Sequence, residues 1–504
     1  MLRFAVFDDQ GPAKSWALVN AHLLGPDDVA APGDIRFERG EIICRKRGTQ
    51  AVALALQYDA GPAGVLVLQT CLLPDSDRPY VLSHELARHR IKTFLAKCEE
   101  WQMFDLSADH PAMKSWEEAR QLFTLGLNDA DPVAQDRYGR ESLARAIDAT
   151  ERLALAHAEV LLHRRYATKP ASATTLGVRI SPRKPPEAAA ELLAKEFDLL
   201  YVPLIWRDLE VAEGQYDWAP VDRWMQWAHK NGRPVVAGPL LDFSARALPR
   251  WMYVWQHDYD TCRDMAYDHI EKVVNRYRNA VSIWSIAAGL NVNDNFRFTP
   301  AQMLDLTRMA NLLVKQGNSI PAVRRGRTML EIVQPFGEHV ATQDDALPPL
   351  AYIDRATQEG IRVDCYGIRL PFGSGAGALR MRDLMQVSHI LDRFFLLELP
   401  LLITGICVPS QPSASGDGGY WQEPWTPDVQ TRWVGRIFGM ALSKPHVESF
   451  FWSDLHDGEQ NDIPHSGLID ANGQPKPALK RLIDMRRRLR KPLGPLKLPA
   501  RNGA

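Results

Sequence analysis

The sequence predicts an α/β fold: a (β/α)₈ barrel preceded by a small antiparallel β domain and a helical segment. Eight short, almost continuously apolar runs alternate with helical stretches from Thr175 to about Arg490. Such runs are typical of parallel strands covered on both faces, and their alternation with helices favours a barrel. The length of 504 residues also indicates more than one domain, because single hydrophobic cores stop growing at about 250–300 residues.

The first domain is expected at residues 1–83. Strand-like runs such as 17–19, 35–37 and 65–68 are separated there by glycine–proline pairs that are typical of turns. We interpret this region as a β-sandwich-like domain. A carbohydrate-binding role for it rests on fold analogy alone.

Residues 84–168 switch to helical periodicity. Apolar side chains recur there at helical spacing, at Leu143, Ala146, Ile147, Leu153, Ala154, Val160 and Leu161. A polar link at 168–172 leads into the barrel, which is expected over 175–490 and is followed by a tail at 491–504. The eight barrel strands are expected at 176–180, 199–205, 235–241, 281–287, 328–333, 363–370, 401–407 and 448–452.

Composition limits the classes of partner. The net charge of −1 gives no global attraction to nucleic acid or to an anionic membrane, so neither is expected. The chain has no apolar run long enough to cross a bilayer and no signal-peptide pattern at its N-terminus, so we expect a cytoplasmic protein. The six cysteines are scattered without a C-x-x-C pair and are expected to be reduced. We expect no cofactor and no bound metal.

Five motifs follow one another along the barrel region, at 209–218, 222–232, 248–251, 452–454 and 467–478. Their order and spacing resemble the family 10 glycoside hydrolases, the endo-β-1,4-xylanases. The resemblance implies a barrel whose site lies at the carboxyl ends of the strands, with a polysaccharide or oligosaccharide as the possible partner. It leaves any protein partner unknown.

The resemblance also identifies the positions of the two catalytic glutamates. In that family the fourth strand ends in the acid/base and the seventh ends in the nucleophile, and the matching positions here are Gly289 and Gly405. Retaining hydrolysis needs two carboxyl groups about 5 Å apart. Because glycine can neither donate a proton nor attack a sugar carbon, the sequence assigns no catalytic residue and predicts that the usual chemistry is lost.

The positions that hold the sugar in that family have changed as well. Apolar or otherwise altered residues replace its polar side chains at Val202, Ile205, Pro239, Phe243, Ala288, Arg369 and Pro371. Function lies in the site rather than in the fold, so this uniform loss favours a barrel without xylanase activity.

Carboxylates elsewhere are the fallback catalytic candidates. Glu338 is preferred because it neighbours His339 just beyond strand five, where it could transfer a proton. Glu331 and Asp454 are the other two fallback candidates. The alternative for Glu338 is a carboxylate that anchors its loop, and the acidic cluster of Asp454, His456, Asp457 and Glu459 is interpreted as solvated loop charge rather than a metal site.

Aromatic rings give the second functional hint, because flat amphipathic rings stack on sugar faces. The candidate binding residues are Trp251, Trp255, Arg369, Trp421, Trp425 and Trp452, and ordinary packing is the alternative for each ring. The loop 409–421 is rich in glycine, proline and serine, and it could form a lid over the barrel.

The leading functional hypothesis is a xylanase-like barrel that has lost hydrolysis and serves as a glycan-binding or assembly protein. The alternative is an active glycoside hydrolase with relocated carboxylates, and a third reading is a structural scaffold. The geometry of the mouth distinguishes them: a carboxylate pair favours the enzyme, an open aromatic cleft favours binding, and a plugged mouth favours a scaffold.

Overall fold

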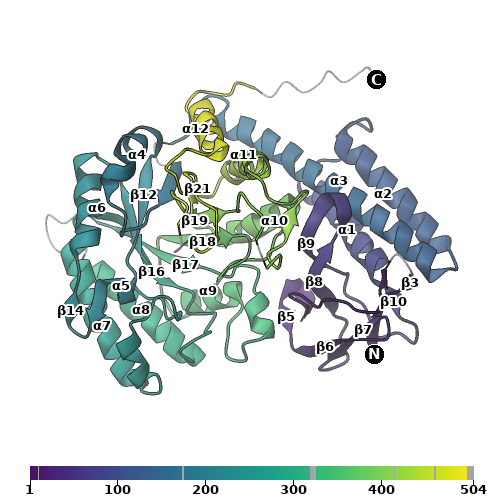
Figure 1. Ribbon diagram of the computed structural model, residues 1–504, viewed down its shortest axis with the longest axis horizontal. Helices are drawn as coiled ribbons and strands as arrows, with labels where there is room; N and C mark the ends of the chain where they lie inside the picture. Colours follow the sequence, from purple (N-terminus) through teal and green to yellow (C-terminus); the bar gives the residue numbers. More distant parts are fainter. Residues whose placement is uncertain are drawn as a thin grey trace.

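The barrel is closed by eight parallel strands in the order of the sequence (Figure 1). The computed structural model describes residues 1–8, 11–172, 175–317, 325–375, 377–413, 415–458 and 461–495. The strands are β11 (Leu176–Arg179), β12 (Leu199–Pro203), β15 (Val235–Gly238), β16 (Val281–Ala288), β17 (Arg327–Ile332), β18 (Cys365–Pro371), β19 (Leu401–Cys407) and β21 (Val447–Trp452). Pairing of β11 with β21 closes the ring. The predicted (β/α)₈ barrel is confirmed.

Helices follow the strands and surround the barrel. They are α4 (Ala190–Glu196), α5 (Trp206–Leu209), α6 (Ala219–Lys230), α7 (Tyr259–Tyr277), α8 (Pro300–Gly317), α9 (Pro349–Gln358), α10 (Leu384–Phe395), α11 (Pro427–Ser443) and α12 (Pro477–Leu489). A short hairpin of β13 (Glu210–Ala212) and β14 (Gln215–Tyr216) precedes α6. The start of α10 is fixed by a capping box between Asp383 and Gln386.

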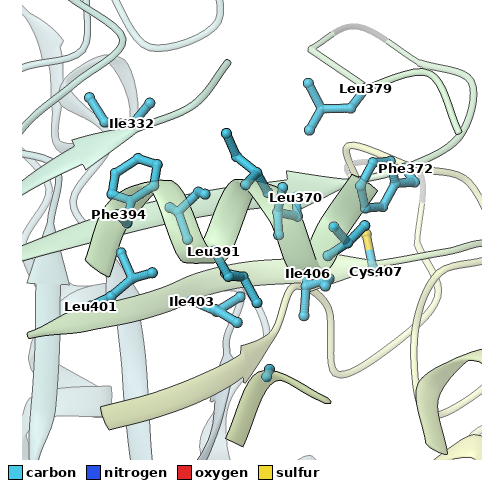
Figure 2. Close-up of a cluster of buried hydrophobic side chains, with 14 of the residues drawn as sticks. Ile332, Leu370, Phe372, Leu379, Leu391, Phe394, Leu401, Ile403, Ile406 and Cys407 are labelled. Atoms are coloured by element: carbon cyan, nitrogen blue, oxygen red, sulfur yellow. The ribbon is translucent and has the colours of Figure 1, made fainter. Parts of the chain in front are cut away.

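The apolar strand runs reflect burial on both faces. All seven residues of β19 are buried. Figure 2 shows Leu391 and Phe394 of α10 close to Leu401 and Ile403 of β19, within the main core. Side chains alternate along a strand, so Leu402 faces the lumen. There it belongs to a separate apolar cluster whose members come from seven strands: Leu199, Tyr201, Val236, Ile283, Met329, Cys365, Leu402 and Phe451.

The N-terminal region contains two sheets, and most of their pairings are antiparallel. One has the order β10 (Tyr80–Val81), β1 (Leu2–Ala5), β7 (Glu41–Lys46), β6 (Gly33–Glu38). The other has the order β20 (Tyr420–Trp421), β9 (Gly64–Gln69), β8 (Ala53–Asp59), β4 (His22–Leu24), β5 (Ala30–Ala31). A small pair, β2 (Phe7–Asp8) and β3 (Gly11–Pro12), lies apart from them. The strand β20 comes from the barrel, because it lies in the loop after β19.

Three long helices connect these sheets to the barrel: α1 (Leu82–Glu100), α2 (Pro111–Asn128) and α3 (Pro132–Tyr166). In Figure 1, α3 runs from the N-terminal region to the barrel helix α11, against which it packs. Glu151 of α3 accepts hydrogen bonds from the Trp421 indole at 2.7 Å and from the Leu384 backbone N–H at 3.0 Å. The helical segment and the barrel therefore share one continuous core.

All six cysteines are free, and five of them are buried. Among the described residues, no helix is both long and apolar enough to span a membrane.

Candidate ligand site at the barrel mouth

The two glycines lie where the motif alignment predicts. Gly289 directly follows the fourth barrel strand, β16, and Gly405 lies near the carboxyl end of the seventh, β19. Gly289 has a φ of 69°, in the left-handed region that favours glycine, and a Cβ added there would lie 3.0 Å from Val333 Cγ2. A Cβ on Gly405 would lie 3.1 Å from Ser453 Oγ. Gly289 is therefore the more constrained of the two positions.

Aromatic rings pack together in the loop that follows β16. Phe296 and Phe298 of the loop after β16 are buried, and the ring of Phe243 lies 5.7 and 4.8 Å from theirs. A hydrogen bond also holds this loop in place, because the Asn293 side chain donates to Phe298 O at 2.9 Å. Phe243, which the family resemblance matches to a sugar-contacting position, contributes to a buried cluster rather than an open surface.

A buried network crosses the lumen below the mouth and centres on Glu331. This carboxylate accepts hydrogen bonds from Tyr201 at 2.8 Å, Ser285 at 2.7 Å, Arg369 Nε at 2.6 Å and Thr404 at 2.6 Å. Burial would raise the pKa of Glu331, but the charges of Arg369 and Arg179 and the hydrogen bonds outweigh it and lower the pKa to about 2. Glu331 is thus a fixed anion with four partners, unsuited to proton transfer near neutral pH.

A cavity of about 380 Å³ lies above this network. Its walls come from the ends of β11, β12, β18, β19 and β21, and they include Arg179, Arg369, Gly405, Ser453, Asp454, His456, Asn461 and Asp462. The guanidinium of Arg179 lies 4.5 Å from the Tyr201 ring centre. The lining is mixed, because apolar side chains such as Ile205 and Leu455 lie among the charged ones, and it contains no tryptophan. Neither Gly289, Glu331 nor Glu338 lines it.

Three carboxylates border the cavity. Asp208 pairs with Arg183 at 2.8 Å, and Asp462 pairs with Arg246 at 2.5 Å. Asp454 accepts a hydrogen bond from Ser466 at 2.7 Å. Burial raises the pKa of Asp454 to about 7, against the opposing effect of the Ser466 hydrogen bond and with a contribution from Asp462. Of the three fallback candidates, Asp454 is the one that the structure places in the cavity.

Glu338, the preferred fallback candidate, lies elsewhere. It begins the short helix η5 (Glu338–Ala341), which contacts β4 and β5 of the N-terminal region, and it forms an ion pair with Arg382. His339 is close to Leu347 O, at 3.1 Å from its Nε2. This geometry matches the loop-anchoring alternative and does not bring Glu338 to the mouth.

The candidate tryptophans divide into two groups. Trp421, Trp425 and Trp452 are buried, and their indole N–H groups donate to Glu151, Gly419 O and Ser466 O at 2.7, 3.0 and 2.8 Å. Buried rings with satisfied N–H groups have the geometry of packing residues. Trp251 and Trp255 are partly exposed on the short helix η4 (Arg250–Trp255), outside the cavity lining.

Loops from three strands meet over the mouth. The Arg246–Asp462 ion pair joins the loop after β15 to the loop after β21, and Gly375 after β18 packs directly against the Asp462 backbone. The described residues of the loop 409–421 do not line the cavity, so they form no lid over it: Gly418 packs on Gly373, and β20 pairs with β9 of the N-terminal sheet. The cavity is therefore a side pocket of a largely covered mouth.

The acidic cluster after β21 was expected to be solvated, but one of its carboxylates is not. Asp457 is buried, pairs with Lys476 at 2.7 Å and accepts from Gly467 N at 2.8 Å. Glu459 lies outside the described residues. In the described ranges, no group of three or more His, Cys, Asp or Glu side chains could hold a metal ion.

Several cavity and lumen residues were not candidates in the sequence: Arg179, Tyr201, Ser285, Thr404 and Asp462. Arg179 could have been found from the sequence, because it is a charged residue at the end of an apolar run. Sites in barrels lie at the carboxyl ends of the strands. A closed barrel with a cavity at that end places the chain in the general class of (β/α)₈ barrels, in which ligand sites lie at the carboxyl ends of the strands.

Comparison with known proteins identifies the particular family. The sequence model of "Glycosyl hydrolase family 10" matches residues 167–304. Endo-1,4-beta-xylanase 3 of Hypocrea jecorina is 30% identical over 283 residues, which cover 55% of this chain and 72% of that protein. Endo-1,4-beta-xylanase B of Humicola insolens is 30% identical over 81 residues, 16% of this chain and 22% of that protein. The chain belongs to glycosyl hydrolase family 10.

Solved structures of the family are also similar. Xylanase 10B of Thermotoga maritima has 17% identity and a TM-score of 0.48, and the match covers 65% of this chain and 98% of that one. Xylanase 10B of Thermotoga petrophila, in complex with xylobiose, has 17% identity and a TM-score of 0.47 over 65% of this chain and 96% of that one.

Proposed function

We propose that this protein is a family 10 barrel that binds a short saccharide without hydrolysing it. The proposal rests on the two positions that the family resemblance matches to the catalytic glutamates. Both are glycine, and Gly289 does not line the cavity. Two carboxyl groups facing one glycosidic bond cannot arise from these positions.

The cavity supports binding of a small polar ligand. Its volume is at the lower end of the range of about 300–1,000 Å³ for small-molecule sites. Arg179, Asn461 and Asp454 offer donors and acceptors for sugar hydroxyls. The endo-1,4-beta-xylanase relatives suggest xylo-oligosaccharides as the first ligands to test.

The test is a glycan array and a hydrolysis screen on one purified sample. We expect saturable binding of a short oligosaccharide and no product. Ser181 is exposed at the cavity rim, so Ser181→Trp should block the cavity and weaken binding, whereas Ser15→Trp, on an exposed residue outside the cavity, should not. Equal binding by both variants would contradict the proposed site.

A second candidate function is hydrolysis through relocated carboxylates. The raised pKa of Asp454 favours it, because a pKa of about 7 suits a general acid. The other two cavity carboxylates are held in ion pairs with arginines, which is the wrong state for a free nucleophile. Turnover that disappears in Asp454→Asn would establish this alternative.

A further inference from the structure

A second cavity lies where the N-terminal sheets, α1 and α10 meet. Its volume is about 310 Å³, and its lining comes chiefly from His22, Asp28 and Gln69 of the N-terminal region, from α1 and from the segment 382–393, which includes most of α10. It shares no residue with the mouth cavity. The two cavities are therefore separate.

Basic side chains dominate this cavity. The lining contains Arg90, Lys92, Lys97, Arg382 and Arg393, against the carboxylates of Asp28 and Glu100. Three histidines, His22, His89 and His389, lie in the same lining. Lysine, arginine and histidine from three separate elements therefore converge on one space.

Two of the arginines are almost fully buried, with 2% of the Arg90 side chain and 7% of the Arg382 side chain exposed. Each has one carboxylate partner, Asp383 for Arg90 and Glu338 for Arg382. Within the described chain, the Nε atoms of both guanidiniums are buried and have no hydrogen-bond partner. A buried guanidinium with unused donors is costly unless an acceptor is supplied.

The two arginines also repel each other. Burial lowers the pKa of Arg382 to about 9, and the charge of Arg90 contributes in the same direction, against the effect of Asp383. The Nδ1 atoms of His89 and His389 likewise have no hydrogen-bond partner within the described residues. Carboxylates already pair with Arg90, Arg382 and Lys97, but these guanidinium and imidazole nitrogens still have no hydrogen-bond partner in the part of the chain that the structure describes.

We propose that this cavity binds the phosphate group of a small molecule. A tetrahedral dianion presents several acceptor oxygens, which suits donors converging from different sides, and arginine forks match phosphate geometry. Arg90 and Arg382 form the buried part of the site, and Lys92 is exposed at its rim. Binding there joins the N-terminal sheets to the barrel helix α10 and stabilises their junction.

The test is calorimetric titration of the full chain at constant ionic strength. Inorganic phosphate and glucose 6-phosphate are the probes, with glucose as the uncharged control. We expect one saturable site for at least one phosphate probe and none for glucose, and the same probe should raise the Tm as its concentration rises. Tighter binding of glucose 6-phosphate identifies a phosphorylated metabolite, and tighter binding of inorganic phosphate identifies the free ion.

Charge-reversal variants locate the site. Lys92→Glu should weaken phosphate binding at least fivefold, whereas Lys480→Glu, an equal charge change on exposed α12, should stay within twofold of the unmodified chain. Arg382→Lys keeps the charge but removes the guanidinium fork and should weaken binding at least tenfold. If Arg382→Lys does not fold, the comparison of Lys92→Glu with Lys480→Glu still tests the location of the site. No saturable phosphate binding, or equal loss in both lysine variants, would overturn the proposal.

Discussion

Glu331 illustrates how a buried carboxylate can hold a barrel together. Its two oxygens connect four strands, because Tyr201, Ser285, Arg369 and Thr404 all donate to it. Sequence identified it as a candidate catalytic group in strand five, yet its four partners were not predictable. They come from strands far apart in the chain, and register between strands is set by tertiary packing.

The first prediction is that Glu331→Gln will destabilise the protein by about 3–5 kcal/mol, because it leaves the buried Arg369 charge without its anion. Urea denaturation at pH 7 measures the change. Glu448→Gln removes the half-exposed partner of Arg327 and should cost about 1 kcal/mol or less. Equal effects from the two variants would contradict the structural role of Glu331.

The second prediction concerns acid. The pKa of Glu331 is about 2 in the folded protein, below the unfolded value of about 4.3, so its stabilisation is complete above about pH 4.3 and is lost as the pH falls toward 2. The stability difference between the unmodified chain and Glu331→Gln should therefore narrow between pH 5 and pH 3. Urea melts at both values measure it, and a constant difference would argue against a lowered pKa.

The third prediction is that Gly289→Glu with Gly405→Glu will not restore xylanase turnover. The Gly289 backbone has φ 69°, Val333 is in the way of a side chain, and the polar groups that would orient a sugar are absent. Aryl-xyloside and xylan turnover by the folded double variant is the measurement, with each single variant as a control. Clear recovery would mean that the rest of the subsite is intact.

At the scale of elements, the least predictable feature is β20. Glycine, proline and serine in the loop 409–421 suggested a lid, but two residues at its end pair with β9, and Trp421 enters the shared core. A two-residue strand has no detectable periodicity, and its partner Val65 lies in the N-terminal sheets, far away in the sequence. Burial raises the pKa of Glu151, the acceptor of the Trp421 N–H, to about 7.

The fourth prediction is that Trp421→Phe will destabilise the protein more than Trp433→Phe does, by about 1–3 kcal/mol, because it leaves a buried Glu151 oxygen with one donor fewer. Both indoles are fully buried, but in the described chain the Trp433 N–H has no hydrogen-bond partner, so its variant reports ring size alone. Thermal and urea unfolding give the comparison. Equal losses would show that the Trp421–Glu151 hydrogen bond contributes little.

For the whole molecule, sequence was most informative where the pattern is local and repeated. The eight predicted strands match the barrel within a few residues, and the one at 401–407 coincides with β19. The covering of the mouth could not be predicted, because it depends on contacts between residues far apart in the sequence, such as Arg246 and Asp462. The phosphate cavity depends likewise on three segments that meet only in the folded chain.

The most direct test of the account is the release of reducing sugar from β-1,4-xylan. The protein, free of contaminating hydrolase, is incubated with xylan beside a buffer control and an active family 10 xylanase. Loss of general acid catalysis alone removes a factor of about 10²–10⁴, and the nucleophile position is also glycine. We predict release equal to the buffer control. Release above it, proportional to protein concentration, would contradict the loss of hydrolysis.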